Sequence, residues 1–328
     1  LLCSRDSNPG PLRIFNVLLD QINNVYVYVY DYVYCQGRVE PESNEVEQAV
    51  TWALAAGYRH IDTAHVYKTE EQVGKAIKAV LDAGKIKRKD LFITTKLWND
   101  AHPRSAVEPA LRESLRNLGL DYVDLYLIHW PVGQFANGTY DLTDYLDTWR
   151  GMIDVKNLNL TKAIGLSNFN QAMIDRILAN GLEKPAVLQV ELNLNLQQPE
   201  LLSYCKEKEI VVMGFTPFGS LFPSKALPDA PAPRVDDPRL VTIADNCNKT
   251  VPQVNLKYLV DLGVIPLPKS LTKSRIEQNI DIFDIYLKDE EIETLKKFDQ
   301  NYRTIPQYKW IDNPYFPFEE LKTKKNKT

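Results

Sequence analysis

The chain has 328 residues and a mass of 37.6 kDa, and its 39 basic and 43 acidic side chains give a net charge of −4. This length suits one large α/β domain or two ordinary ones, and the short basic stretch at the C-terminus is no nucleic-acid-binding track. No apolar run reaches the roughly 18 residues of a membrane span, and the four cysteines lack zinc-site spacing. We therefore expect a cytoplasmic protein with no metal, membrane or nucleic-acid partner, and the simplest oligomeric state is a monomer.

From residue 43 onward, amphipathic segments alternate with short β-rich runs. The segment NEVEQAVTWALAAG has apolar residues at helical spacing and ends at Gly57, a typical helix stop. Further helices are predicted over residues 70–84, 102–119 and 145–157. Seven predicted strands separate or follow such helices: residues 58–62, 91–96, 123–130, 162–168, 186–192, 210–220 and 263–270.

This alternation predicts right-handed βαβ units and a parallel sheet. The sheet could be open and doubly wound, or it could close into a (β/α)8 TIM barrel that lacks one recognisable strand. The open form usually carries a Gly-rich phosphate turn, and none occurs here. A barrel instead builds its active site from the carboxyl ends of its strands. Polar residues stand at those ends: Asp62, Lys96, His129, Ser167, Asn168, Gln189, Lys269 and Ser270. We predict the barrel.

Four of the residues near these strand ends could act together. Asp62, Lys96 and His129 end neighbouring strands, which lie about 5 Å apart, and Tyr67 follows Asp62 by five residues. A nearby ammonium is expected to lower the pKa of the Tyr67 phenol from about 10. Tyr67 could then protonate a carbonyl oxygen while His129 orients that oxygen.

Each of these residues also has a purely structural interpretation. Asp62 and Lys96 alone are more often a structural ion pair than a catalytic one. Tyr67 alone is most simply a packed tyrosine, and His129 beside Trp130 could be a half-buried core histidine. The combination of all four on adjacent strand ends favours catalysis.

Several longer segments resemble one enzyme family. GYRHIDTAHVY, TTKLWN, LDYVDLYLIHWP, KAIGLSNFN and IPLPKSLTKSRIEQN are similar to signature segments of the aldo-keto reductases and follow in the same order. DAPAPRVDDPRL and the WND after Lys96 most resemble insect members, including reductases of 3-dehydroecdysone. The resemblance implies a (β/α)8 barrel and reduction of aldehydes or ketones by NADPH. The alternative is a non-catalytic or incomplete barrel that serves as a binding or structural protein, and the intact set of four residues argues against it.

The resemblance also implies roles for individual residues. Asp62, Tyr67, Lys96 and His129 match the catalytic tetrad, with Tyr67 as general acid. Ser167, Asn168 and Gln189 match contacts to the nicotinamide carboxamide, and Phe215 stands where many members stack a tyrosine on that ring. Other matched cofactor contacts lie in the 216–234 loop, at the 2′-phosphate or at the adenine: Phe218, Ser220, Lys269, Ser270, Arg275, Gln278 and Asn279. Gln278 replaces the more common glutamate, so we expect a slightly altered cofactor affinity.

The predicted substrate pocket is aromatic. We expect Val66, Tyr67, Trp98 and Trp130 to line it, and Trp310 in the tail of residues 301–328 could close it from above. Trp98 and Trp130 could equally fill the core, but both stand just past strand ends, at the mouth of the barrel. An aromatic pocket with one polar corner suits an apolar aldehyde or ketone as the small-molecule substrate. Prolines at 306, 314 and 317 predict an extended tail instead of a helix.

Residues 1–37 do not match the rest of the chain. The stretch VYVYVYDYVY has the alternation and residue types of a strand. It lacks the Gly-Thr-aromatic turn with which the family's first strand ends. Alternating Tyr and Val is also what a TATGTA repeat encodes. We therefore predict that residues 1–37 derive from a mispredicted exon or non-coding DNA, that the barrel domain spans residues 38–300, and that its first strand is missing or replaced.

Overall fold

The computed structural model describes the backbone of residues 27–29, 44–224 and 226–325. Among these residues, eight strands form one parallel sheet, and each of them pairs with the next of the eight along the chain. A separate two-stranded hairpin lies between the fourth and the fifth of these strands in the sequence. In sheet order the eight strands are β1 (Val27–Val29), β2 (His60–Asp62), β3 (Phe92–Leu97), β4 (Val123–Ile128), β7 (Thr161–Ser167), β8 (Val187–Glu191), β9 (Val211–Phe215) and β10 (Val264–Pro266).

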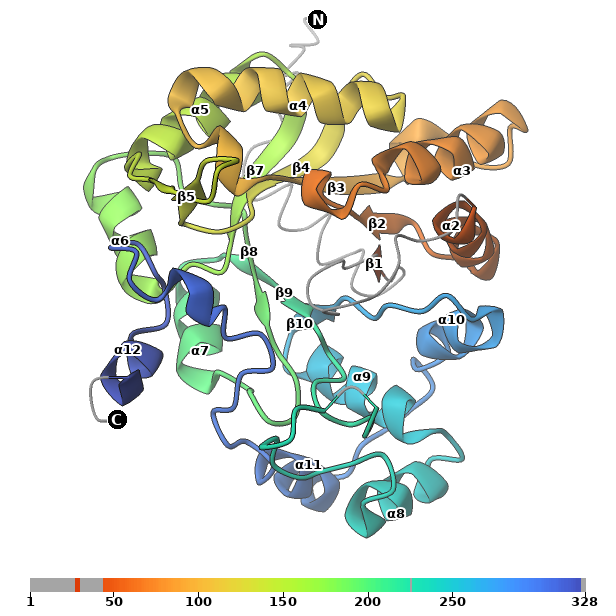
Figure 1. Cartoon of the computed structure of the whole chain (residues 1–328). Helices are drawn as coiled ribbons and strands as arrows, with labels where there is room; N and C mark the ends of the chain where they lie inside the picture. Colours follow the sequence, from red (N-terminus) through yellow and green to blue (C-terminus); the bar gives the residue numbers. More distant parts are fainter. Residues whose placement is uncertain (1–26, 30–43, 225, 326–328) are drawn as a thin grey trace, which may run out of the picture.

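Helices surround these strands in the manner of a (β/α)8 barrel (Figure 1). Most of them connect one strand to the next, as parallel strands require. The helices are α2 (Glu45–Ala56), α3 (Glu70–Asp82), α4 (Arg104–Leu118), α5 (Tyr145–Asn157), α6 (Gln171–Ala179), α7 (Pro199–Glu207), α8 (Pro238–Asn246), α9 (Val251–Asp261), α10 (Lys273–Ile280), α11 (Asp289–Lys296) and α12 (Glu319–Lys325). The barrel was the closure predicted from the alternation of elements, and the parallel order confirms it over an open doubly wound sheet.

Most strand positions are buried on both faces of the sheet, the polar ones included. Every residue of β3 and of β4 is buried. Helices cover the outer face of the sheet, and side chains fill the space inside it. Most of the described strand positions are therefore closed to water, with Lys162 of β7 an exception, and the polar side chains at the carboxyl ends of the strands mark the site.

The first position of the sheet is occupied by part of the Val/Tyr stretch. Val27–Val29 pairs in parallel with β2, with Val27 opposite His60 and Val29 opposite Asp62. The first strand was predicted to be either missing or replaced. The structure shows a short strand, Val27–Val29, in its place. The remainder of residues 1–43 lies outside the described residues, so the predicted foreign origin of residues 1–37 stays a prediction.

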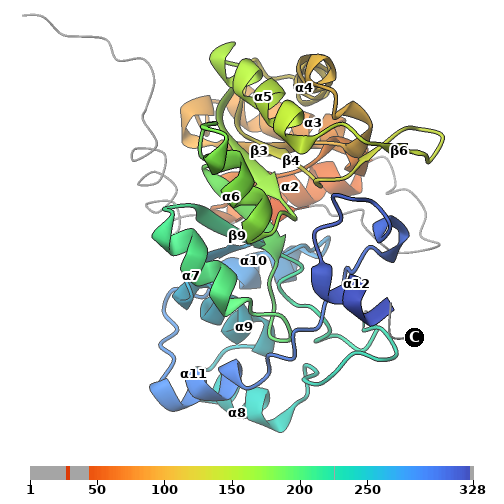
Figure 2. The same ribbon diagram turned by 90° about the vertical axis from the view of Figure 1, so that its left-hand side faces the viewer.

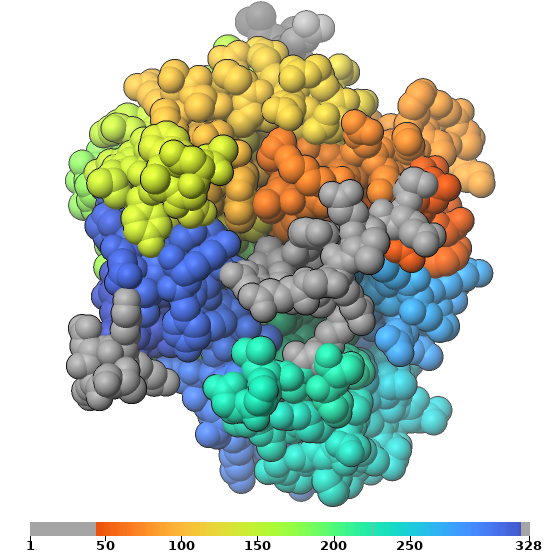
Figure 3. Space-filling model, viewed as in Figure 1, coloured from red at the N-terminus to blue at the C-terminus, as the bar shows by residue number. Residues whose placement is uncertain are grey.

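Two further segments lie on the carboxyl side of the strands. One is the hairpin of β5 (Gly133–Gln134) and β6 (Tyr140–Asp141), and the other is the C-terminal tail. Figure 2 shows the hairpin and α12 projecting on the same side of the molecule. In Figure 3 the tail, in blue, lies against the yellow-green region of the hairpin, and the Tyr140 hydroxyl donates to the carbonyl of Lys309 at 3.1 Å.

Some boundaries differ from those predicted. The predicted strand over residues 263–270 ends at Pro266, so Lys269 and Ser270 follow the strand instead of ending it. Gln189 lies in the middle of β8. The tail was expected to contain no helix, and this was wrong in two places: a short 3-10 helix, η4, spans Tyr308–Trp310, and α12 begins at Glu319, two residues after the last proline. None of the described helices is long and apolar enough to cross a bilayer.

Candidate active site

Neighbouring strands bring the four predicted catalytic residues together. Asp62 ends β2, Lys96 lies near the end of β3, and His129 directly follows β4. Tyr67 ends a short 3-10 helix, η1 (His65–Tyr67), that follows β2. All four side chains are buried. The parallel register places their strand ends on one rim of the barrel.

The Lys96 ammonium is the centre of this group. Its Nζ donates to Asp62 Oδ1, to the carbonyl of Thr63 at 3.1 Å and to the Tyr67 hydroxyl at 3.3 Å. Its side chain is 0% exposed. A buried ammonium is expensive unless it is paired, and here one carboxylate and two further oxygens meet that requirement. The same contacts place a positive charge beside a phenol.

His129 lies across from Tyr67. The two rings meet edge to face with their centroids 5.6 Å apart, and Trp98 packs on the imidazole at 5.1 Å. Burial, and then the nearby Lys96 ammonium, lower the pKa of His129 well below its usual value. The imidazole is therefore neutral at physiological pH, and it can donate a hydrogen bond through one ring nitrogen only.

Asp62 has a second partner that the sequence did not reveal. Gln189 reaches across from β8, and its Nε2 donates to Asp62 Oδ2 at 2.7 Å. Burial raises the pKa of Asp62, while Lys96 and Gln189 act in the opposite direction. With both oxygens engaged, the carboxylate holds Lys96 in one orientation. The contact joins residues 127 positions apart, so no local motif could have shown it.

The residues predicted to contact a nicotinamide line the next strand ends. Asn168 has a φ of 62°, a left-handed conformation that asparagine tolerates better than most residues. Its Nδ2 donates to the carbonyl of His129 at 2.9 Å and contacts Ser167 Oγ at 3.2 Å. Both residues are buried, and Phe215, at the end of β9, is half-buried. Asn168 thereby ties the β7 strand end to the His129 backbone.

The residues predicted to contact the rest of the cofactor fall into two groups. In the 216–234 loop, Phe218 is half-buried against Phe222, and Ser220 is buried with no hydrogen-bond partner for its hydroxyl among the described residues. The second group lies after β10 and on α10. Of this group, Lys269, Arg275 and Gln278 are exposed, whereas Ser270 and Asn279 are buried.

The predicted pocket aromatics form a continuous cluster of edge-to-face and tilted ring contacts. Trp98 lies between His129 and Trp310, and Trp130 packs on Trp310 with centroids 5.1 Å apart. Trp130 and Trp310 are 2% and 0% exposed, while Trp98 and Val66 are half-buried. Trp310 Nε1 also donates to Gln134 Oε1 of the hairpin at 3.2 Å, a contact not predicted from the sequence. The tail is therefore packed onto the rim through Trp310.

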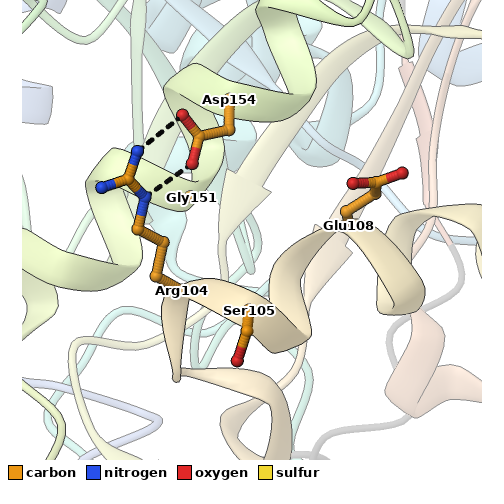
Figure 4. A pocket seen from close by; sticks show the side chains of 5 residues that line it. All are labelled: Arg104, Ser105, Glu108, Gly151 and Asp154. Carbon is orange, nitrogen blue, oxygen red and sulfur yellow. Dashed lines mark hydrogen bonds and ion pairs between the residues drawn. The ribbon is translucent and has the colours of Figure 1, made fainter.

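A surface hollow of about 450 Å³ lies elsewhere, between α4 and α5. Figure 4 shows the bidentate pair of Arg104 and Asp154 across it. The hollow holds none of the buried, perturbed groups of the rim, so we assign it no catalytic role.

No group of three His, Cys, Asp or Glu side chains in the part of the chain that the structure describes could hold a metal ion.

Comparison with known proteins agrees with this geometry. The model of the aldo/keto reductase family matches residues 36–300. The chain belongs to this family. Aldo-keto reductase AKR2E4 of Bombyx mori is 48% identical over 274 residues, which is 84% of this chain and 89% of that protein. The human aldo-keto reductase family 1 member A1 is 38% identical over 305 residues, 87% of this chain and 94% of its own.

Solved structures of other aldo-keto reductases have the same fold. That of Bombyx mori AKR2E4 in complex with NADP superposes with a TM-score of 0.84 at 45% identity, covering 89% of this chain and 94% of that one. That of AKR2E5 complexed with NADPH superposes with a TM-score of 0.86 at 42% identity, covering 90% of each chain. The silkworm relatives agree with the predicted resemblance to insect aldo-keto reductases.

Proposed function

We propose that this aldo-keto reductase converts aldehydes and ketones to alcohols with NADPH, and that Tyr67 is the general acid. The observation that carries the proposal is the buried chain of Asp62, Lys96 and Tyr67, in which one ammonium contacts both a carboxylate and the phenol. The silkworm structures that contain NADP or NADPH support the choice of cofactor.

The chemistry divides between cofactor and protein. NADPH supplies the hydride that reaches the carbonyl carbon. The Tyr67 hydroxyl gives its proton to the carbonyl oxygen, so the product is an alcohol and the residue is left as a phenolate. Lys96 stabilises that phenolate, because an adjacent cation favours the charged form of a phenol. Asp62, fixed by Gln189, holds Lys96 in place. Neutral His129 is placed to donate to the substrate oxygen and so orient it.

The residues of the 216–234 loop, of the segment after β10 and of α10 provide donors that suit the phosphates of NADPH. Ser220 is a buried hydroxyl with no partner among the described residues, and buried polar groups are normally satisfied. We assign it, with Phe218, to the pyrophosphate. The exposed Lys269 and Arg275, with Ser270, provide an ammonium, a guanidinium and a hydroxyl, the donor set that suits a 2′-phosphate. Ser167, Asn168, Gln189 and Phe215 would hold the nicotinamide, and Gln278 and Asn279 the adenine.

The substrate is an apolar carbonyl compound. Val66 and Trp98 are the half-buried members of the predicted pocket, and Trp310 packs behind Trp98. This surface offers apolar contacts with polar groups only at Tyr67 and His129. Aromatic aldehydes and ketosteroids both meet that description.

The test is NADPH oxidation by the purified protein against a panel of aldehydes and ketosteroids. Tyr67→Phe removes only the hydroxyl and should lower kcat by about 10²- to 10⁴-fold, with little change in NADPH affinity. Tyr286→Phe is the matched control, because Tyr286 is 81% exposed on the surface. Full activity in Tyr67→Phe would contradict the mechanism. NADPH binding without any carbonyl reduction would favour the alternative, a non-catalytic binding protein.

A further inference from the structure

Four buried polar residues lie in residues 191–198, the last residue of β8 and the connection to α7, called here the β8–α7 link; it follows Gln189 but has no role in the proposed chemistry. One of the four, Gln197, contacts α11 and α9, because its Nε2 donates to the carbonyl of Leu295 at 2.9 Å and its Oε1 accepts from the Tyr258 hydroxyl at 2.8 Å.

The other three point elsewhere. Glu191, Asn193 and Asn195 are 1%, 1% and 2% exposed. Such burial of amide and carboxylate groups is costly unless each forms hydrogen bonds, so their partners show what the link holds. These partners lie in two separate segments, the C-terminal tail and the 216–234 loop.

The link first holds the start of the tail. The Glu191 carboxylate accepts the backbone N–H of Thr304 at 2.7 Å and that of Ile305 at 3.0 Å. The carbonyl of Asn195 accepts the backbone N–H groups of Gln300 and Tyr302, at 3.1 and 3.0 Å. Three backbone N–H groups of the tail, and that of Gln300 directly before it, therefore depend on two link residues, a few positions before Trp310.

The link also holds both ends of the 216–234 loop. Asn195 Nδ2 donates to the carbonyl of Ala232 at 2.6 Å, and Asn193 Nδ2 lies 3.4 Å from the carbonyl of Thr216. Gly219 packs so closely on Asn193 that an added Cβ would lie 2.6 Å from its Cγ. Thr216 has a φ of 49°, a strained conformation for a β-branched residue that persists only when neighbours enforce it.

The loop and the tail also meet directly. The Tyr302 hydroxyl donates to Asp229 Oδ1 at 3.0 Å. Burial, and then this hydrogen bond to Asp229, raise the pKa of Tyr302 to about 12, so the phenol remains a donor at neutral pH. One residue, Tyr302, thus contacts the link through its backbone and the loop through its side chain.

We propose that the β8–α7 link couples the 216–234 loop to the C-terminal tail, so that cofactor binding strengthens substrate binding and the reverse. The proposal rests on the proposed function, in which the loop covers the cofactor and the tail closes the substrate pocket. Asn195 and Tyr302 act as positioning residues in this coupling. A loop that is ordered by the cofactor fixes Ala232 and Asp229, and these in turn fix the tail that carries Trp310. By linkage, the two ligands must strengthen each other by the same factor.

The experiment measures that factor without turnover. NADP⁺ is titrated into the whole protein with and without saturating benzaldehyde, a non-productive pair because NADP⁺ carries no hydride with which to reduce the aldehyde. In the wild type we expect benzaldehyde to tighten NADP⁺ binding by about tenfold, within the usual range of coupling. Tyr302→Phe and Asn195→Ala should each reduce the factor to about threefold or less. Their double variant should lose little more, because the two act in one connection.

Tyr140→Phe is the matched control. It too removes one hydroxyl bond to the tail, from Tyr140 to the Lys309 carbonyl, but it does not involve the loop. Its coupling factor should stay at the wild-type value. Unchanged coupling in Tyr302→Phe, or no coupling in a wild type that binds NADP⁺, would overturn the inference and leave the proposed function standing. Failure of the wild type to bind NADP⁺ would overturn both. Should Asn195→Ala not fold, Tyr302→Phe decides alone.

Discussion

Arg275 is the single residue on which the preference for NADPH over NADH most depends in the proposed site. It lies exposed on α10, and a guanidinium there can form two parallel bonds to a 2′-phosphate. Arg275→Leu should raise the Kd for NADPH by about tenfold or more, the loss of one strong charge-assisted contact. The Kd for NADH, which has no 2′-phosphate, should not change.

Lys273→Leu is the control for this measurement, because Lys273 lies on the same helix and pairs with Glu277 instead. Fluorescence titration with both cofactors gives all the constants. Equal weakening of NADPH and NADH by Arg275→Leu would show that Arg275 supports the helix and not the phosphate.

His102 makes the stability of the fold depend on pH. It is fully buried, and burial lowers its pKa to about 4, against the opposing effect of Asp141. Between about pH 6.5 and pH 4 the unfolded chain therefore takes up a proton that the folded chain does not. As the pH is lowered through this window, the free energy of unfolding must decrease. At pH 5, His102 alone should make it about 2 kcal/mol lower than at neutral pH.

The variant His102→Gln should remove that share of the pH dependence. Urea unfolding at pH 7.5 and pH 5 gives the difference in stability for wild type and variant. We expect the difference to be smaller in the variant, whatever its stability at pH 7.5. His60, with a pKa lowered to about 3 by burial and Lys96, should retain its own contribution in both proteins. An unchanged difference would contradict this account.

At the scale of elements, α3 and α4 pack closely enough to require a glycine. A Cβ on Gly74 of α3 would lie 2.5 Å from the backbone oxygen of Leu118 at the end of α4. In an open helix, Gly→Ala would stabilise the protein by about 1 kcal/mol. Here the helices would have to separate, so Gly74→Ala should destabilise the protein by about 1–3 kcal/mol.

Lys75→Ala, on the exposed face of the same helix, should change stability by less than about 0.5 kcal/mol. Chemical unfolding of both variants measures the two effects side by side. A more stable Gly74→Ala would mean that the two helices are not held at this distance in solution.

At the scale of the whole molecule, cofactor binding should stabilise the barrel. NADPH contacts are proposed on strand ends from β7 to β10 and on α10, so the folded chain binds it and the unfolded chain does not. At about 100 times its Kd, NADPH should add about 2.7 kcal/mol to the free energy of unfolding. Thermal unfolding followed by circular dichroism would show a higher midpoint with NADPH, and an unchanged midpoint would contradict the proposed site.

The same thermal scans test the expectation, drawn from the sequence, that the protein is a monomer. A monomer has a midpoint that does not depend on protein concentration, whereas a dimer that dissociates on unfolding becomes more stable as concentration rises. We expect midpoints that agree over a hundredfold range of concentration. A midpoint that rises with concentration would overturn the monomer.

The main features of the fold could be predicted because they depend on local pattern. Helical periodicity around Val46 and Val50, and the short β-rich runs of β3 and β4, repeat in a βαβ order that only a few architectures allow. The end of the tail was missed because a helix of seven residues carries little pattern of its own. The first strand was not predicted from residues 1–37, yet Val27–Val29 pairs with β2, because pairing in a sheet depends on the neighbouring strand.

By itself, the sequence determined the parallel barrel, the family and the positions of Asp62, Tyr67, Lys96 and His129, since residue types and their order along the chain are sufficient for these. Only the tertiary structure decided which groups touch. It placed Gln189 on Asp62, the hairpin on Trp310, and Asn195 between the loop and the tail. The physical reason is that a hydrogen bond requires two atoms within about 3.5 Å, and for residues far apart in the chain that distance is set by packing.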